Sequence, residues 1–303
     1  MLGSVYAYYI ASSCTINCNN NSKLTVMNVE ESTGLKILNC YGNTALTSLP
    51  VTGCTAMTTL DCHGNALTGI GNLNNCTALT SIQCYNNKIT SLDVSSLSNL
   101  TELICRQNNL TSLNVSNKTK LTKLYAYMNK LTSLNVQGCS ALNDLDVNSN
   151  NLTSLSVQGC NALRTLNCCV NKITASGANT LINSLCTIPS GSQGVLKYIY
   201  PGYTSSNYNE GNVSLTAAQI QTARNKRWYP KKIVNGSWVD IPVSVPGDVN
   251  GDGQVTAADI TALYDVLLNN NYSQVVNGDQ TGDGIITAAD VTAVYTIMLS
   301  SKE

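Results

Sequence analysis

Two short segments near the C-terminal end carry oxygen-bearing side chains at intervals that suit a calcium ion. Their sequences are DVNGDGQVTAAD, from Asp248 to Asp259, and DQTGDGIITAAD, from Asp279 to Asp290. Each has oxygen donors at loop positions 1, 3, 5, 7, 9 and 12 and a glycine at position 6 for a sharp turn, as calcium-binding loops do. Because two copies match, simple Asp-Gly turns do not explain the pattern, and we predict two bound Ca²⁺ ions.

The predicted calcium ligands are side chains and two backbone carbonyls, and an amphipathic helix is expected after each loop. The ligands are Asp248, Asn250, Asp252, the Gln254 carbonyl, Thr256 and Asp259 in the first loop, and Asp279, Thr281, Asp283, the Ile285 carbonyl, Thr287 and Asp290 in the second. The segments ITALYDVLL and VTAVYTIML that follow have apolar residues at helical spacing. The core residues predicted from this spacing are Ile260, Leu263, Leu267, Val291, Val294 and Met298.

This duplicated loop and helix resembles a type I dockerin over residues 247–299. It differs from EF-hands, which have Glu at loop position 12 and an entering helix. The resemblance implies a small all-α, EF-hand-like module that folds on calcium and binds a cohesin on an extracellular bacterial scaffold, often for polysaccharide catabolism. It also implies partner contacts at loop positions 10 and 11, here Ala257, Ala258, Ala288 and Ala289. The basic pair that the family carries further along each helix is replaced by Tyr264, Asp265, Tyr295 and Thr296, which puts the usual partner in question.

A tandem repeat occupies the chain from Ser13 to about Thr174. Its turns begin at Ser13, Leu35, Met57, Leu79, Leu100, Leu121, Leu142 and Leu163. The period of about 21 residues and the pattern LxxLx(C/L)xxNxL are typical of a leucine-rich-repeat solenoid. Alternating apolar and polar positions predict a short strand in each turn, so the stacked turns should form a parallel sheet with a concave outer face. The return segment is too short for a full helix and is expected to be extended or 3₁₀. The region resembles bacterial leucine-rich repeats of the short, surface-protein kind.

Asparagine and cysteine recur at fixed places in these turns. The asparagines are Asn21, Asn43, Asn65, Asn87, Asn108, Asn129, Asn150 and Asn171, and we interpret them as a buried ladder that pairs backbone groups rather than as a polar binding row. Cysteines occupy two inward positions, Cys18, Cys40, Cys62, Cys84, Cys105 and Cys168 at one and Cys54, Cys76, Cys139 and Cys160 at the other. Ala126 and Val147 share the first position, which favours buried free thiols over disulfides.

One row on the predicted concave face is rich in aromatic residues. Five consecutive strands place Tyr41, His63, Tyr85, Arg106 and Tyr127 in line, and Tyr125 lies beside them with Ile104. Tyrosine and arginine offer contact area and hydrogen bonds for recognition of a protein or glycan ligand. Aromatic neighbours on a sheet also stabilise it by cross-strand contact, and the sequence favours neither explanation.

The segments that flank the repeats are predicted to be caps and a linker. MLGSVYAYYIAS lacks the basic residues of a signal peptide and is expected to cap the solenoid. After the repeats we expect a helix in TASGANTLINSL, a strand in GVLKYIY, a helix in SLTAAQIQTARNKRWY with Ser214 or Thr216 as its N-cap, and a hairpin in KKIVNGSWVDI. The RNKR run is predicted to be a solvated helix end, with an anion site as the alternative. The predicted fold class is therefore α/β for residues 1–240, a leucine-rich-repeat solenoid with an α/β cap, and all-α for the dockerin-like module at residues 246–303.

Composition and charge limit the function. Charged residues make up 11% of the chain, and residues 246–303 hold eight acids and one base, which argues against nucleic-acid binding. We predict a secreted or cell-surface bacterial protein that binds a ligand with its solenoid and a cohesin-like partner with its C-terminal module. The alternatives are a component of a polysaccharide-degrading complex and a structural surface protein. An enzyme is not favoured because His63 is the only histidine and Asp61, Glu102, Asp144 and Asp146 are scattered over an open sheet.

Overall fold

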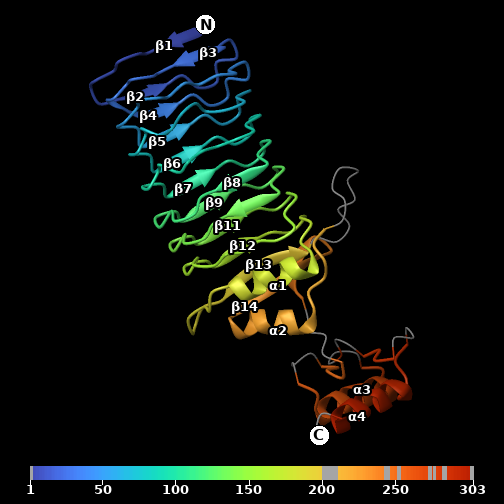
Figure 1. The fold of residues 1–303 in the computed structure, drawn as a ribbon. Helices are drawn as coiled ribbons and strands as arrows, with labels where there is room; N and C mark the ends of the chain where they lie inside the picture. The colour runs from blue at the N-terminus through green and yellow to red at the C-terminus, as the bar shows by residue number, and fades with distance from the viewer. Residues whose placement is uncertain are drawn as a thin grey trace.

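The computed structural model describes residues 3–199, 211–241, 246–250, 254–271, 275, 278–281 and 285–300. Within them the chain forms a parallel-sheet solenoid with a few helices at its C-terminal end (Figure 1). The main sheet runs in the order β15-β14-β13-β12-β11-β9-β7-β6-β5-β4-β2. Its repeat strands are β2 (Cys14–Asn17), β4 (Leu35–Asn39), β5 (Thr59–Asp61), β6 (Ser81–Gln83), β7 (Glu102–Ile104), β9 (Lys123–Tyr125), β11 (Asp144–Asp146) and β12 (Thr165–Asn167). The predicted fold class is confirmed.

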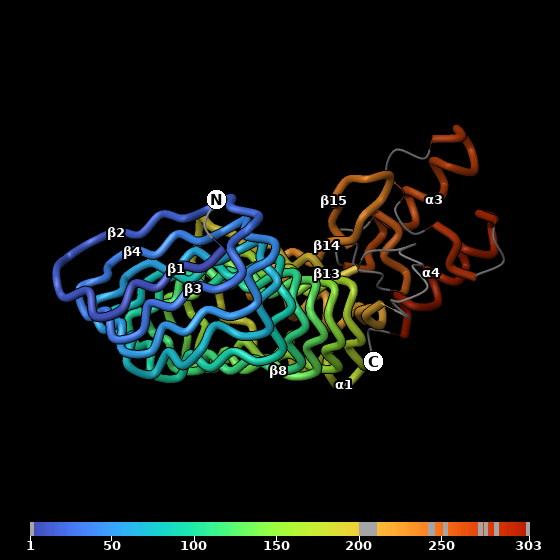
Figure 2. The backbone as a smooth tube through the Cα atoms, turned by 90° about the horizontal axis from the view of Figure 1, so that it is seen from above, coloured from blue at the N-terminus to red at the C-terminus, as the bar shows by residue number. Residues whose placement is uncertain are grey.

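Each repeat strand pairs with its neighbour at equivalent positions of the repeat. Ile82 of β6 is opposite Leu60 of β5 on one side and Leu103 of β7 on the other. Side chains alternate between the two faces of a strand, so this register places the leucine column inside and the residues before and after it on the outer face. The turns therefore follow one another along nearly the same path (Figure 2).

The return side forms short extended strands in some of the turns, which agrees with the first of the two predicted alternatives, extended or 3₁₀. Short strands β8 (Ser112–Asn114) and β10 (Ser133–Asn135) pair in parallel on that side, and β1 (Ser4–Tyr6) pairs with β3 (Val26–Asn28) near the N-terminus. The N-terminal segment thus adds its backbone to the end of the stack. This arrangement agrees with the predicted capping role.

Buried thiols fill the solenoid interior, and all thirteen cysteines are free. The thiols on the return side donate weak hydrogen bonds to carbonyls of the preceding turn, for example from Cys76 Sγ to Val51 O at 3.3 Å. Burial raises the pKa of Cys62 and Cys105 well above the usual range for a thiol. These cysteines are small apolar core residues, as predicted.

The asparagine ladder joins neighbouring turns. Asn129 Nδ2 donates to the carbonyls of Cys105 and Ala126, at 3.0 and 3.1 Å, and Asn129 Oδ1 accepts from Leu110 N at 3.0 Å. Asn65, Asn108, Asn150 and Asn171 make equivalent bonds in their own turns. Asn212, which the sequence analysis missed, completes the ladder from the C-terminal cap. Its Nδ2 donates to Cys168 O and its Oδ1 accepts from Ile173 N.

The C-terminal cap consists of α1 (Ala175–Ser184), β13 (Gly194–Ile199), α2 (Ala217–Asn225), β14 (Trp228–Val234) and β15 (Ser237–Asp240). Thr216 is the N-cap of α2, with Gln219 completing a capping box. The predicted helix was too long, because Trp228 begins β14. This side chain is fully buried and its Nε1 donates to Cys186 O at 2.9 Å.

The basic run at residues 224–227 lies at the C-terminal end of α2, as predicted, with Arg224 in the last turn and Arg227 exposed. Lys226 Nζ donates to the carbonyls of Ile182 and Asn183 at the end of α1, at 3.1 and 2.7 Å. Arg224 Nη2 donates to Ile241 O at 3.0 Å. Both cations therefore also hold the cap together through backbone carbonyls. The alternative of an anion site stays a prediction.

Two helices, α3 (Ala257–Asn269) and α4 (Ala288–Ser300), lie side by side near the C-terminus (Figure 1). Their own small core contains Val249, Ala262, Leu263, Val291 and Val294, with Ile260 and Met298 half-buried against it. Leu267 was wrongly predicted as a core residue, since 37% of it is exposed while Val266 is 2% exposed. The buried stripe of α3 continues from Leu263 by three residues rather than by four. Among the described residues, no helix is long and apolar enough to cross a membrane.

Candidate functional site

The last acidic residue of each predicted calcium loop ties the loop to the start of its helix. Asp259 is fully buried; its Oδ1 accepts from Val249 N and Asn250 N, at 2.8 and 3.1 Å, and its Oδ2 from Thr256 N at 2.8 Å. Thr256 is also the N-cap of α3. The carboxylate therefore fixes both ends of the loop.

The second loop repeats this geometry. Asp290 Oδ1 accepts from Gln280 N and Thr281 N, at 2.7 and 2.9 Å, and Oδ2 accepts from Thr287 N at 2.7 Å. Burial by itself would raise the pKa of Asp290, but the backbone N–H groups of Thr287, Thr281 and Gln280 outweigh it and lower that pKa. The carboxylate is held ionised, which is the state that a metal ligand needs.

The donor set of both loops fits calcium. Asp248, at position 1, is fully buried, and its loop also offers carboxylate, amide, hydroxyl and carbonyl oxygens. Hard oxygen donors without cysteine or histidine suit Ca²⁺ rather than a softer transition metal. The predicted ligands Asp252 and Asp283 lie outside the described residues. Within the described residues, no three His, Cys, Asp or Glu side chains converge. Asp279, Thr281, Gln254 and Ile285 remain predicted ligands.

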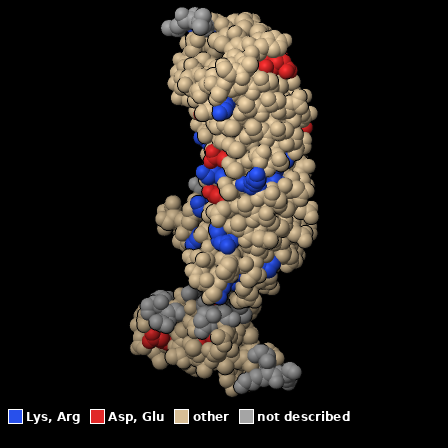
Figure 3. Space-filling view, turned by 90° about the vertical axis from the view of Figure 1, so that its left-hand side faces the viewer, with Lys and Arg blue, Asp and Glu red and all other residues tan. Residues whose placement is uncertain are grey.

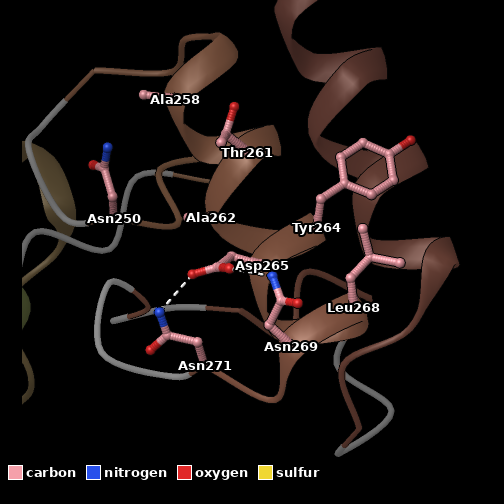
Figure 4. Close-up of a pocket in the computed structure, with 9 residues that line it drawn as sticks. All are labelled: Asn250, Ala258, Thr261, Ala262, Tyr264, Asp265, Leu268, Asn269 and Asn271. Carbon is pink, nitrogen blue, oxygen red and sulfur yellow. Dashed lines mark hydrogen bonds between the residues drawn. The ribbon is translucent and has the colours of Figure 1, made fainter.

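An exposed groove runs along α3 beside the first loop. Ala258, Thr261, Tyr264, Asp265 and Leu268 line it, and its volume is about 690 Å³ (Figure 4). Tyr264 is 50% exposed and Leu268 is 77% exposed. Asn269 Nδ2 and Asn271 Nδ2 donate to the two carboxylate oxygens of Asp265, at 2.7 and 2.6 Å, so this acid is turned toward the end of the helix. The groove therefore combines the exposed Tyr264 and Leu268 with small and polar side chains.

The second helix carries the same residue types at the equivalent places. Tyr295 and Leu299 of α4 are 55% and 54% exposed, and Ala288 and Ala289 are exposed as well. Ala257 and Ala258 are exposed on α3. All four alanines predicted to contact a partner are thus accessible, and each of the two helices also carries an exposed Tyr and an exposed Leu.

The aromatic row on the concave face is a continuous stack. The ring centroids of Tyr41 and His63 are 4.6 Å apart with planes at 7°, and those of His63 and Tyr85 are 4.2 Å apart at 9°. Arg106 Cζ lies 4.0 Å from the Tyr85 centroid and 5.4 Å from that of Tyr127. The structure brings all five predicted row residues together, each half-buried.

Tyr125 lies beside this row and its hydroxyl contacts the nearby carboxylate of Asp144. Its ring centroid is 6.5 Å from that of Tyr127, and its hydroxyl donates to Asp144 Oδ2 at 2.5 Å. Burial and the neighbouring carboxylate of Asp144 raise the pKa of Tyr125, so it stays protonated as a donor.

On the face shown in Figure 3 most of the surface is uncharged, and acidic and basic side chains lie close together near the middle.

Comparison with known families accounts for the C-terminal region. A model of the dockerin type I domain matches residues 246–299. These residues are a type I dockerin domain. A model of leucine-rich repeats, in two copies, matches residues 55–99. The recognition of both parts from the sequence is confirmed, and both are binding modules rather than catalytic ones.

Several solved structures resemble the leucine-rich-repeat part. The functional domain of InlJ from Listeria monocytogenes, described as including a cysteine ladder, is 32% identical with a TM-score of 0.44 and covers 52% of this chain. YopM from Yersinia enterocolitica is 23% identical with a TM-score of 0.46 and covers 67%. This chain spans 40% of the length of each. A Leptospira interrogans leucine-rich-repeat protein is 19% identical, with a TM-score of 0.40 and coverage of 70% and 62% of the two chains. The search of curated proteins found no match.

The dockerin assignment agrees with the loop geometry, but sequence reasoning missed part of the exposed helix surface. Tyr264 and Tyr295 were noted only as replacements for a basic pair, and Leu268 and Leu299 were not singled out. The sequence could have indicated this surface, because Tyr and Leu recur at equivalent places in the two copies. The helical spacing also predicts that both side chains point outward. Type I dockerin domains generally bind calcium, which supports Ca²⁺ as the cofactor.

Proposed function

We propose that this protein is an extracellular bacterial binding protein with a tether at one end and a recognition surface along its solenoid. Its dockerin domain, proposed to span residues 246–303, would fold around two Ca²⁺ ions and bind a cohesin-like protein. Its leucine-rich-repeat domain, proposed as residues 1–240, would hold a protein or glycan ligand on the concave face. Separate hydrophobic cores for the two regions support this division.

The observation that carries the tether is the pair of equivalent exposed faces on α3 and α4. Each combines two small alanines with an exposed Tyr and Leu, for example Ala258, Tyr264 and Leu268 on α3. Exposed apolar groups that form a contiguous patch with a polar rim mark an interaction surface. Because the two faces carry the same residues, either could dock the same partner.

The tether is tested by titrating the full-length chain with type I cohesins in calcium and in chelator. Calcium-dependent binding is expected, and replacing all four alanines (Ala257, Ala258, Ala288 and Ala289) by Asp should abolish it while the helical circular-dichroism signal remains. The matched controls change one copy at a time, Ala257→Asp with Ala258→Asp or Ala288→Asp with Ala289→Asp. Each should leave affinity within about twofold, because the other face remains. Binding that survives the fourfold change would place the contact elsewhere.

The concave face is proposed as the recognition surface because its stack is rigid and half-exposed. Stacked side chains lose little conformational entropy when a ligand binds, which favours recognition. Tyr85→Ala with Arg106→Ala should leave the melting temperature within a few degrees yet abolish ligand capture. A large loss of stability with unchanged capture would mean that the row only supports the sheet.

A second candidate function is an accessory role in a polysaccharide-degrading complex, which the dockerin domain favours. Neither binding module supplies catalytic groups, so we propose that the chain is not itself an enzyme. Hydrolysis assays on plant and bacterial glycans should show no activity. A third candidate is a structural surface protein, and calcium-dependent cohesin binding would exclude a purely structural dockerin.

A further inference from the structure

Arg106 is the fourth of the five residues in the concave stack, and among the described residues it has no carboxylate partner. The acids around it are engaged elsewhere. Asp61 Oδ1 is 2.5 Å from His63 Nδ1, and Glu102 Oε1 is 3.0 Å from Lys123 Nζ. Asp144 accepts from the Tyr125 hydroxyl, and Asp146 accepts from Asn148 and Asn167. The side-chain contact found for the Arg106 guanidinium besides the rings is Gln107 Oε1.

The two flanking rings fix how this guanidinium is presented. Tyr85 covers one face of the group at 4.0 Å and Tyr127 approaches at 5.4 Å. With its faces against rings, a planar guanidinium interacts through N–H groups at its edge, and this fork matches a carboxylate in a bidentate pair. Partial burial strengthens such a pair relative to one in water. The geometry therefore suits an incoming anion.

The same stack argues against a sugar as the ligand that carries the anionic group. Sugars bind aromatic residues by lying on an exposed ring face. Here both faces of His63 are covered, by Tyr41 and Tyr85, and Tyr85 is itself covered by His63 and Arg106. Ile104 is the last residue of β7, and Arg106 follows two residues later. We expect the Ile104 side chain to contact the methylene groups of an acidic side chain bound there.

We propose that Arg106 binds the carboxylate of an Asp or Glu side chain on an extended acidic polypeptide that lies along the row from Tyr41 to Tyr127. The row spans roughly 19 Å at a strand spacing of about 4.8 Å, which matches about six residues of extended chain. This inference rests on the proposed function of the concave face and specifies the chemistry of its ligand.

The test measures binding of the full-length chain, in excess calcium, to poly-L-glutamate, polygalacturonate and neutral dextran by calorimetry. Poly-L-glutamate should bind, and Arg106→Gln should weaken its binding at least tenfold. Arg106→Lys should give an intermediate loss, because an ammonium cannot form the bidentate pair. Arg164→Gln is the matched control, since Arg164 is bonded to backbone carbonyls at the edge of the repeat and should leave affinity within twofold.

Three results would overturn the inference. Poly-L-glutamate binding that is unchanged in Arg106→Gln removes Arg106 from the site. Equal or tighter Arg106-dependent binding of polygalacturonate assigns the site to an acidic glycan. Absence of binding to all three polymers also contradicts the inference. Capture of a natural ligand by the Tyr85→Ala variant then distinguishes the proposed concave recognition surface from the proposed carboxylate ligand. If the wild type captures a natural ligand and Tyr85→Ala does not, the concave face is a recognition surface and only the proposal of a carboxylate ligand is wrong. If Tyr85→Ala captures that ligand as well as the wild type does, both proposals are wrong.

Discussion

At the scale of single residues, the asparagine that follows each strand has the strongest structural role. Its amide serves three backbone groups that belong to two turns, so each asparagine links neighbours as well as closing its own turn. Buried backbone groups that lose their partners cost free energy. Repetition of one residue type at one place is therefore explained by hydrogen bonding, without any ligand.

Asn129→Ala tests this role. The change leaves the carbonyls of Cys105 and Ala126 and the N–H of Leu110 without their side-chain partner, and the free energy of unfolding should fall by about 2–4 kcal/mol. Urea unfolding measures the change. Asn161→Ala is the matched control, because Asn161 is exposed outside the ladder and should change the free energy by less than about 0.5 kcal/mol. Equal effects of the two substitutions would contradict the ladder.

The buried thiols make stability sensitive to alkaline pH. Burial raises the pKa of Cys84 from 9.0 to about 12. Below pH 9 the thiol is protonated in both states, and its contribution to stability is complete. Between pH 9 and about 12 only the unfolded chain releases the proton, so stability falls as pH rises.

Cys84→Ala isolates this effect. One thiol contributes a slope of about 1.4 kcal/mol per pH unit above pH 9. The difference in unfolding free energy between the two proteins should therefore change with that slope, as followed by urea unfolding at pH 8, 9 and 10. Alanine occupies the equivalent place at Ala126, so the variant is expected to fold. A difference in unfolding free energy that is independent of pH would show that the Cys84 thiol has the same pKa in the folded and the unfolded protein.

At the scale of elements, α3 and α4 depend on the loops that precede them. Each helix begins where an aspartate, Asp259 or Asp290, holds its loop closed. The region from residue 246 to 303 has eight acids and one base, which repel one another without a bound cation. Metal binding that occurs only in the folded state stabilises that state.

Chelation of calcium is therefore expected to unfold these two helices. They hold 13 residues each, against 10 in α1 and 9 in α2, so far-ultraviolet circular dichroism should lose more than half of its helical signal in chelator. Magnesium at the same concentration is the control and should not restore the signal, since it accepts such flexible loops poorly. An unchanged spectrum in chelator would refute a calcium-dependent fold.

The elements also show which features the sequence could predict. Period and spacing located the strands, the ladder, the thiols and the two C-terminal helices with the aspartates at their starts, because each is set by local repetition. They did not locate the end of α2, where Trp228 leaves the helical pattern to be buried under the cap. Lys226 and Asn212 were also missed, because their partners are about 40 residues away in sequence and only the folded cap brings them together.

At the scale of the whole molecule, the described residues form two hydrophobic cores, and we expect each to unfold for a different reason. The core of the solenoid grows by stacking turns, and its stability is a sum of interactions between neighbours. The core between α3 and α4 is small, so it relies on its loops. Chelation should consequently remove one transition in calorimetry and leave the solenoid transition unchanged.

The most direct test compares the proteins that the full-length chain captures from the secretome of its source organism, by quantitative mass spectrometry with calcium or chelator. The baits are the wild type, the fourfold Ala→Asp variant of the α3 and α4 faces, and the Tyr85→Ala, Arg106→Ala variant of the row. Two separable sets of captured proteins are expected. The first set should be lost in chelator and with the fourfold Ala→Asp variant, but not with the Tyr85→Ala, Arg106→Ala variant. The second set should be lost only with the Tyr85→Ala, Arg106→Ala variant. A single set that every variant removes, or none that responds to calcium, would contradict a protein that tethers with one end and recognises with the other.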